Sequence, residues 1–215
     1  MKLPYLSVFA FTALIASTPC EAASPTTRRI VPHGSSPSGQ IRWAARNSAS
    51  KDGAYQWHIM LYPKAAASAD EGVPLCESMS VGVRISADDQ WILVEDGGPS
   101  LGIHLRLFKQ TQGLHYVEQK TDLDDAVEKS LAHSPVARNA NPTLLDHTYL
   151  HCLGWSPDGK ASLEFSGHGA ENGKRIEINS WACSFNPKTL TVLPGAPASL
   201  AEPAQDAASG PKRPK

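Results

Sequence analysis

The chain has 215 residues, of which 20 are lysine or arginine and 21 are aspartate or glutamate, for a formal net charge of −1. A near-neutral chain lacks the clustered basic field that nucleic acids and anionic membranes attract, so the composition argues against both as partners. The length is enough for one domain with its own core, or at most for two small ones.

The first 22 residues have the three-part form of a secretory signal peptide. Lys2 supplies a positive start, an apolar stretch runs from Leu3 to Ala16, and small residues then lead to a cleavage point after Ala22 or the next alanine. The apolar stretch is shorter than the roughly 20 residues of a transmembrane helix. A lipoprotein would instead use Cys20, but Pro19 at the scissile bond argues against this. The sequence predicts a periplasmic or secreted protein without stable membrane insertion after cleavage.

Both flanks of the predicted folded part have a disordered composition. Residues 23–54 are rich in serine, proline, glycine, alanine and arginine, and residues 194–215 contain one large apolar residue, Leu200. Such segments bury too little apolar surface to offset the entropy lost on ordering. We therefore expect a flexible N-terminal arm over 23–54, a β-rich domain over 55–193 and a disordered tail over 194–215.

The central part has the short alternating segments of a mainly β domain. Alternation predicts strands over 55–62, 80–85 and 103–107, and the apolar run 91–94 is typical of a central strand covered on both faces. Further strands are predicted at 114–117, 148–153, 161–165, 174–183 and 190–193. Frequent Gly, Pro and Asp turns between short strands favour antiparallel sheets.

One helix is predicted near residues 121–133. Leu123, Val127 and Leu131 recur at i, i+4 and i+8 and so form one apolar stripe. Thr121 is the expected N-cap, because acidic residues crowd the turn that follows. The expected fold class is mainly β, with antiparallel sheets in two blade-like or sandwich-packed units and this one short helix.

Two stretches of the chain are similar to each other. The segments 86–90 (Ser-Ala-Asp-Asp-Gln) and 156–160 (Ser-Pro-Asp-Gly-Lys) each precede an apolar strand. Gly97-Gly98 and Gly167-His168 follow at the same offset and are expected to form turns. An internal repeat of this kind is typical of propeller blades or stacked sheets.

The segment Trp155-Ser156-Pro157-Asp158-Gly159-Lys160 resembles the signature of the TolB-like, or WD40-like, β-propeller repeat. The earlier copy is a degenerate version without the proline and glycine. The resemblance covers two hairpin units and implies a scaffold that binds proteins, since the motif marks a turn. Two blades do not close a propeller, so we favour a two-sheet sandwich, with a propeller piece completed by oligomerisation as an alternative.

The sequence predicts no cofactor and no catalytic site. The glycine-rich stretch 97–102 precedes a strand rather than a helix, so we interpret it as a hairpin loop and not a phosphate-binding loop. No Gly-x-Ser-x-Gly elbow occurs, and Cys76 lacks the neighbours of a cysteine-protease nucleophile. A small secreted hydrolase, with a site assembled only in three dimensions, remains the main alternative to a binding protein.

Two further groups of residues are candidates for metal or disulfide chemistry. Asp146, His147 and His151 would form a metal site on a helix, but the surrounding residues favour a strand, where residues four apart lie some 13 Å from each other. Of the three cysteines in the mature chain, Cys152 and Cys183 are the preferred disulfide pair. The alternative is three buried thiols.

The expected function is that of an exported, non-enzymatic binding or scaffold protein of the cell envelope, with a protein or envelope component as partner. A purely structural subunit of a larger assembly is a further possibility. The binding surface is expected at the loops around 97–100 and 167–169. Asp96, Gly98, His104 and His168 are the candidate binding residues.

Overall fold

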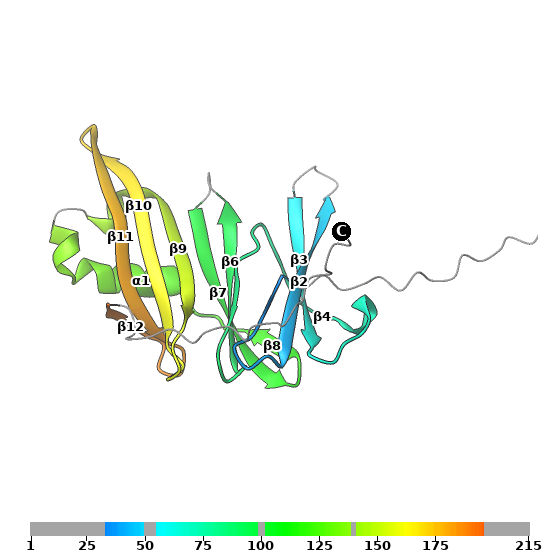
Figure 1. The fold of residues 1–215 in the computed structure, drawn as a ribbon. Coiled ribbons are helices and arrows are strands. Elements are labelled where there is room, and N and C mark those ends of the chain that lie inside the picture. Colours follow the sequence, from blue (N-terminus) through cyan, green and yellow to red (C-terminus); the bar gives the residue numbers. More distant parts are fainter. Residues whose placement is uncertain (1–32, 50–54, 99–101, 139–140, 196–215) are drawn as a thin grey trace, which may run out of the picture.

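The computed structural model describes residues 33–49, 55–98, 102–138 and 141–195 (Figure 1). The predicted signal peptide, residues 23–32 of the predicted arm and nearly all of the predicted tail lie outside these ranges. Within them the chain is mainly β with antiparallel sheets and one α-helix, which confirms the predicted fold class. None of the helices in the described ranges has the length and apolar character needed to cross a membrane.

The strands form three units of four consecutive antiparallel strands, where the sequence had indicated two. The first unit contains β1 (Gly34–Ser35), β2 (Ile41–Ala49), β3 (Tyr55–Pro63) and β4 (Val73–Ser78). The strands pair in chain order, and β2 pairs with β3 along its whole length. A short 3₁₀ helix, Ala69–Glu71, lies between β3 and β4.

The expectation of a flexible arm does not hold for residues 34–49, which form β1 and β2. Ile41 and Trp43 are only 3% and 7% exposed, and they belong to the same apolar cluster as Ile59 and Leu61 of β3. Few apolar residues are needed in β2, because only one face of the strand contacts this cluster. The average composition of residues 23–54 therefore did not reveal the strand β2.

The second unit contains β5 (Val83–Ile85), β6 (Trp91–Gly98), β7 (Gly102–Gln112) and β8 (His115–Glu118). These strands also pair antiparallel in chain order. The sequence predicted a strand at each of these four places. Figure 1 shows β6 and β7 between the strands of the first unit and those of the third.

The third unit contains β9 (Leu145–Trp155), β10 (Ala161–Glu171), β11 (Lys174–Asn186) and β12 (Thr191–Pro194). The sequence predicted all four, the first three with shorter bounds and the last at 190–193, and they too pair in chain order. A single parallel pair, Ile103 with Tyr149, connects β7 to β9, so that the second and third units share one sheet. Both sheets are open in the part of the chain that the structure describes.

The same turn joins the first and second strands of every unit. In each turn a buried serine donates its backbone N–H to a carbonyl over 2.8 Å. The acceptor is the first residue of the second strand, five positions on, in the first two units, and Lys160, four positions on and just before β10, in the third. The side-chain oxygen of the serine accepts from the N–H of that acceptor residue, and the residue three positions after the serine has a positive φ. The three serines are Ser36, Ser86 and Ser156, and the positive-φ residues are Gly39, Asp89 and Gly159.

The copy at residues 36–40 (Ser-Pro-Ser-Gly-Gln) was missed in the sequence, because it lacks the aspartate of the other two copies. Glycine fits the positive-φ position without strain, whereas Asp89 occupies it with a φ of 57°. The turn chemistry is therefore repeated three times, although the sequence signature is clear only once.

The strand β6 contributes to both of the main apolar clusters and so packs against the units on its two sides. Trp91 and Leu93 belong to a larger apolar cluster that includes the third unit and the helix, while Ile92 and Val94 belong to a second cluster with the first unit. Successive side chains of a strand point to opposite faces, so a strand covered on both faces is apolar at every position. This confirms the prediction made from the run 91–94.

The helix α1 (Leu123–Ala132) lies between the second and third units in the sequence and contacts both β7 and β12. Its predicted apolar stripe is fully buried in the larger cluster, as expected. The N-cap is Asp122 rather than Thr121, since the Asp122 side chain accepts from the N–H of Asp125. Two short 3₁₀ helices follow, at Pro135–Arg138 and Pro142–Leu144.

The turn expected at Gly167-His168 does not exist, because β10 continues through it to Glu171. The glycines there allow another part of the backbone to come close. A Cβ at Gly169 would lie 2.1 Å from the Leu144 carbonyl oxygen, and a Cβ at Gly167 would lie 3.0 Å from that of His147. Close backbone approach, and not turn geometry, therefore explains these glycines.

Candidate functional site

The first strands of all three units line one pocket of about 350 Å³. β1 and the turn after it contribute residues on one side, the whole of β5 contributes on another, and the end of β9 closes a third. Trp43 of β2 completes the lining. A pocket of this size and mixed character is within the range of ligand sites.

Two tryptophans form rigid walls of this pocket. Trp155 is only 2% exposed, and its indole Nε1 donates to the backbone carbonyl of Arg84 over 3.1 Å. Trp43 lies against Gly34, where a Cβ would come within 2.6 Å of the indole nitrogen, and the His33 ring is 5.5 Å from the Trp43 ring. Gly34 is therefore required for the close approach of Trp43.

The charge of the lining is positive. Arg84 and His33 contribute the only ionisable side chains, and no carboxylate is among the described residues that line the pocket. Arg84 is exposed, and the hydrogen bond recorded for its guanidinium runs to the Val83 carbonyl at 3.1 Å. The other guanidinium N–H groups have no protein acceptor in the described part of the chain. Such a group is suited to bind an anion.

The β5 strand also offers backbone groups at the pocket. It is the last strand of its sheet. Gly82 and Ser86, on either side of it, hydrogen-bond to β6, so by the alternation of an antiparallel pair the N–H and C=O of Val83 and Ile85 point away from β6. Edge groups of this kind are a template for an additional extended chain.

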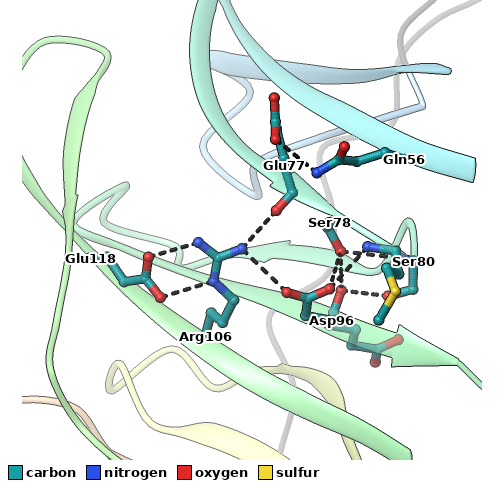
Figure 2. A network of polar contacts seen from close by, with 9 residues as sticks. Gln56, Glu77, Ser78, Ser80, Asp96, Arg106 and Glu118 are labelled. Carbon is teal, nitrogen blue, oxygen red and sulfur yellow. Dashed lines mark hydrogen bonds and ion pairs between the residues drawn. The ribbon is translucent and has the colours of Figure 1, made fainter. Parts of the chain in front are cut away.

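The predicted binding residue Asp96 lies elsewhere, in a polar network between the first and second units (Figure 2). Its Oδ1 accepts from the Ser78 hydroxyl at 3.2 Å and from the Met79 N–H at 2.9 Å. Its Oδ2 accepts from Arg106 at 3.3 Å. The same Ser78 hydroxyl proton is shared with the Glu95 carbonyl, whose oxygen is 2.9 Å from the Ser78 Oγ. Asp96 is therefore engaged in connecting β4 to β6.

Arg106 occupies the centre of this network. Its Nε and Nη2 donate to the two carboxylate oxygens of Glu118 at 2.8 and 2.7 Å, and its Nη1 donates to the Glu77 carbonyl at 2.7 Å. The hydrogen bond from Arg106 lowers the pKa of the Glu118 carboxyl. All three guanidinium nitrogens thus donate hydrogen bonds within the protein, as Figure 2 shows. The network connects β7 to β4, β6 and β8, and it leaves no nitrogen of Arg106 unpaired for a ligand.

The structure places three of the four predicted binding residues, Asp96, Gly98 and His104, in the β6–β7 hairpin, and only His168 lies apart from them. Gly98 pairs with Gly102 at the end of the β6–β7 hairpin, and His104 lies opposite Asp96 on β7. The His104 Nδ1 is 3.3 Å from Asp124 Oδ2 at the start of α1, and burial raises the pKa of that aspartate. His168 lies on β10, in the third unit.

The predicted metal ligands are also separated. Asp146 is exposed, His147 packs against His168, and the His151 Nδ1 is 3.3 Å from a carboxylate oxygen of Glu95. All three lie on β9, so the helical arrangement of a four-residue spacing does not apply. No group of three potential metal ligands is gathered among the residues described.

The predicted Cys152–Cys183 disulfide is wrong. Cys152 of β9 and Cys183 of β11 both pair with Leu163 of β10, on its two sides. Two strand spacings separate their Cα atoms by about 9–10 Å, beyond the reach of a disulfide. Both thiols are free, as is that of Cys76, and burial raises the pKa of Cys152 and Cys183 to about 12.

No family model, curated protein or solved structure matched this chain. The candidate site therefore rests on geometry alone. Its main residues, Trp43, Arg84 and Trp155, were not selected from the sequence. The available signal was positional, since each lies within a few residues of one of the three repeated turns.

Proposed function

We propose that this protein is an exported, non-catalytic binding protein that takes a ligand with an apolar body and an anionic group. The observation that supports this most directly is the pocket among the first strands of the three units. It combines the two indole walls with the Arg84 guanidinium and contains no described carboxylate. An apolar pocket with a few placed polar groups is the usual form of a ligand site.

The three-unit architecture supports a scaffold role. Each unit is a four-stranded antiparallel meander, and each has the same serine turn between its first and second strands. This repetition agrees with the resemblance to propeller repeats, whose four-stranded blades surround a central channel. The pocket occupies the position that such a channel would have, because first strands surround it.

An extended peptide that carries a carboxylate is the ligand class we favour. The outer edge of β5 provides the N–H groups of Val83 and Ile85 and the Ile85 carbonyl for an added strand, while the Val83 carbonyl accepts from the Arg84 guanidinium. Arg84 is on the same strand and would bind the carboxylate as a charge-assisted pair. The indole walls would accept an apolar side chain of the peptide.

The pocket provides no support for the hydrolase alternative. An acyl-transfer site needs a nucleophile, a histidine and a carboxylate within hydrogen-bond distance. The lining includes Ser35 and His33, but no described carboxylate is there to orient the imidazole. Cys76 is outside the lining, and burial raises the pKa of its thiol to about 11.

A matched pair of fluorescent probes tests the pocket. The anion 1-anilinonaphthalene-8-sulfonate and the neutral N-phenyl-1-naphthylamine share an apolar body and differ in charge. We expect Arg84→Gln to weaken binding of the anion roughly tenfold, about 1.4 kcal/mol, and to leave the neutral probe unchanged. Arg175→Gln, on an exposed part of β11, is the control and should affect neither probe.

Equal binding of the anionic probe by wild type and Arg84→Gln would refute this assignment of the pocket. The peptide is tested with a set of extended hexapeptides ending in a free carboxylate, each compared with its C-terminal amide. Export is tested separately by the intact mass of protein recovered from outside the cytoplasm, which should lack residues 1–22.

A further inference from the structure

Two histidines that are far apart in the sequence lie directly opposite each other on neighbouring strands. His147 of β9 and His168 of β10 are register partners in the antiparallel pair, so their side chains project from the same face of the sheet. Their ring centroids are 5.1 Å apart, and the ring planes are tilted by 33°. The pair is a product of strand register and is independent of the pocket.

The spacing of the two rings matches that of imidazoles bound to one metal ion. A tetrahedral metal with metal–nitrogen bonds of about 2.0–2.1 Å holds the centroids of two imidazole ligands roughly 5 Å apart. Two rings that only stack on each other lie parallel, whereas these two ring planes are tilted by 33°. The observed geometry therefore places both rings within reach of a shared ion after small side-chain rotations.

The surroundings leave both imidazoles available. In the described ranges neither His147 nor His168 takes part in a recorded hydrogen bond or ion pair, and both are partly exposed. The Tyr149 ring stacks on His168 at 6.1 Å and limits the rotation of that imidazole. The sheet face opposite to this one carries the larger apolar cluster, so the pair faces away from the core.

Glu177 and Arg175 carry charges on the same face of the sheet as the pair. Glu177 of β11 is the register partner of His168, and its carboxylate forms an ion pair with Arg175 at 3.1 Å. A negative side chain in this row favours a cation over an anion as the ligand. Because Glu177 is paired with Arg175, the described site offers two protein ligands.

We propose that His147 and His168 form a binding site for a divalent transition-metal ion such as Zn²⁺ or Ni²⁺, with water in the remaining coordination positions. Imidazole nitrogen is a preferred ligand of both ions. Two protein ligands with open positions make an exchangeable site rather than a closed structural one. The site differs from the one suggested by the four-residue spacing, because His151 is engaged with Glu95.

Isothermal titration of the untagged full chain with zinc chloride and with nickel chloride tests the proposal. We expect His147→Ala and His168→Ala each to weaken the affinity at least tenfold, and the double variant to be no weaker than the singles. His147→Gln and His168→Gln, which keep more of the side-chain volume, should show the same loss. Circular dichroism of each variant establishes that it is folded.

His151→Ala is the matched control, since His151 lies on the same strand and the same face as His147. It should retain the wild-type affinity within about twofold, as should His115→Ala on β8. Wild-type affinity in His147→Ala or His168→Ala would overturn the proposal. An equal loss in His151→Ala would also overturn it, because the ligands would then be the pair on β9.

Discussion

The indole N–H of Trp155 donates to the backbone carbonyl of Arg84 over 3.1 Å, and this bond joins the first strand of the third unit to that of the second. Trp155 also belongs to the larger apolar cluster and lines the pocket. One side chain therefore contributes to the packing of two units and to the wall of the candidate site.

Replacing Trp155 by phenylalanine should destabilise the protein by about 2–3 kcal/mol, because the variant loses both the hydrogen bond and part of a buried ring. Trp181→Phe is the matched comparison. Trp181 is nearly as buried, in the same cluster, but no hydrogen bond is recorded for its indole in the described residues. We expect a smaller loss there, about 1–2 kcal/mol. Urea unfolding measures both, and equal losses would contradict a role for the Arg84 bond.

The turn serines provide a second prediction. Ser156→Ala should cost about 1–2 kcal/mol, because it removes the acceptor of the Lys160 N–H inside a buried turn. Ser36→Ala and Ser86→Ala should cost a similar amount, since their turns are built in the same way. Ser134→Ala is the control, because the buried Ser134 hydroxyl has no partner in the described structure. Its removal should be neutral or stabilising in thermal unfolding. A cost equal to that of Ser156→Ala would show that volume, and not the hydrogen bond, matters.

Periodicity was sufficient to predict most of the strands and the helix. The alternation at 103–107 and the stripe of Leu123, Val127 and Leu131 are local patterns, and local patterns do not depend on the partner against which they pack. The apolar run 91–94 even indicated that two layers cover β6. The strands β1, β2 and β4 of the first unit were not predicted. In β2 the apolar residues are diluted among arginine, asparagine and alanine, so that only its pairing with β3 reveals the strand.

The candidate sites could not be predicted, because they depend on register and on packing between units. Nothing in the sequence places His147 opposite His168, since a shift of one residue would put the two rings on opposite faces. The pocket depends in the same way on three first strands that are widely separated in the chain. The failed disulfide has the same cause: both cysteines pair with Leu163, but on opposite sides of it.

The cysteines give a third prediction. Thiolate is the reactive form, and a thiol with a pKa of about 11 is ionised to roughly one part in a thousand at pH 8. Burial raises the pKa of Cys76 to about 11 and that of Cys152 and Cys183 to about 12. We therefore expect iodoacetamide at pH 8 to modify Cys152 and Cys183 at least about 100-fold more slowly in the native protein than in 6 M guanidinium chloride. Peptide mapping by mass spectrometry distinguishes the sites. Rapid native labelling of Cys183, or a disulfide between Cys152 and Cys183, would contradict the structure.

The pairing of Arg106 with Glu118 makes a prediction about pH. The hydrogen bond from Arg106 lowers the pKa of Glu118 below 4.5, so the ionised carboxylate stabilises the fold above that pH. This contribution is lost as the pH falls through the folded-state pKa, when the carboxyl becomes protonated. Glu118→Gln should therefore be less stable than wild type at pH 7, by about 0.5–1 kcal/mol for this partly exposed pair, and the difference should shrink at pH 3.

Urea unfolding at pH 7, 5 and 3 measures this difference, with Glu171→Gln as the control. Glu171 is exposed at the end of β10 and has no recorded ion pair in the described residues, so its replacement should change stability little at any of these pH values. A difference between wild type and Glu118→Gln that stays constant from pH 7 to 3 would mean that the charge of Glu118 contributes nothing. In that case Arg106 would contribute through its bonds to the Glu77 carbonyl of β4 and to Asp96 of β6.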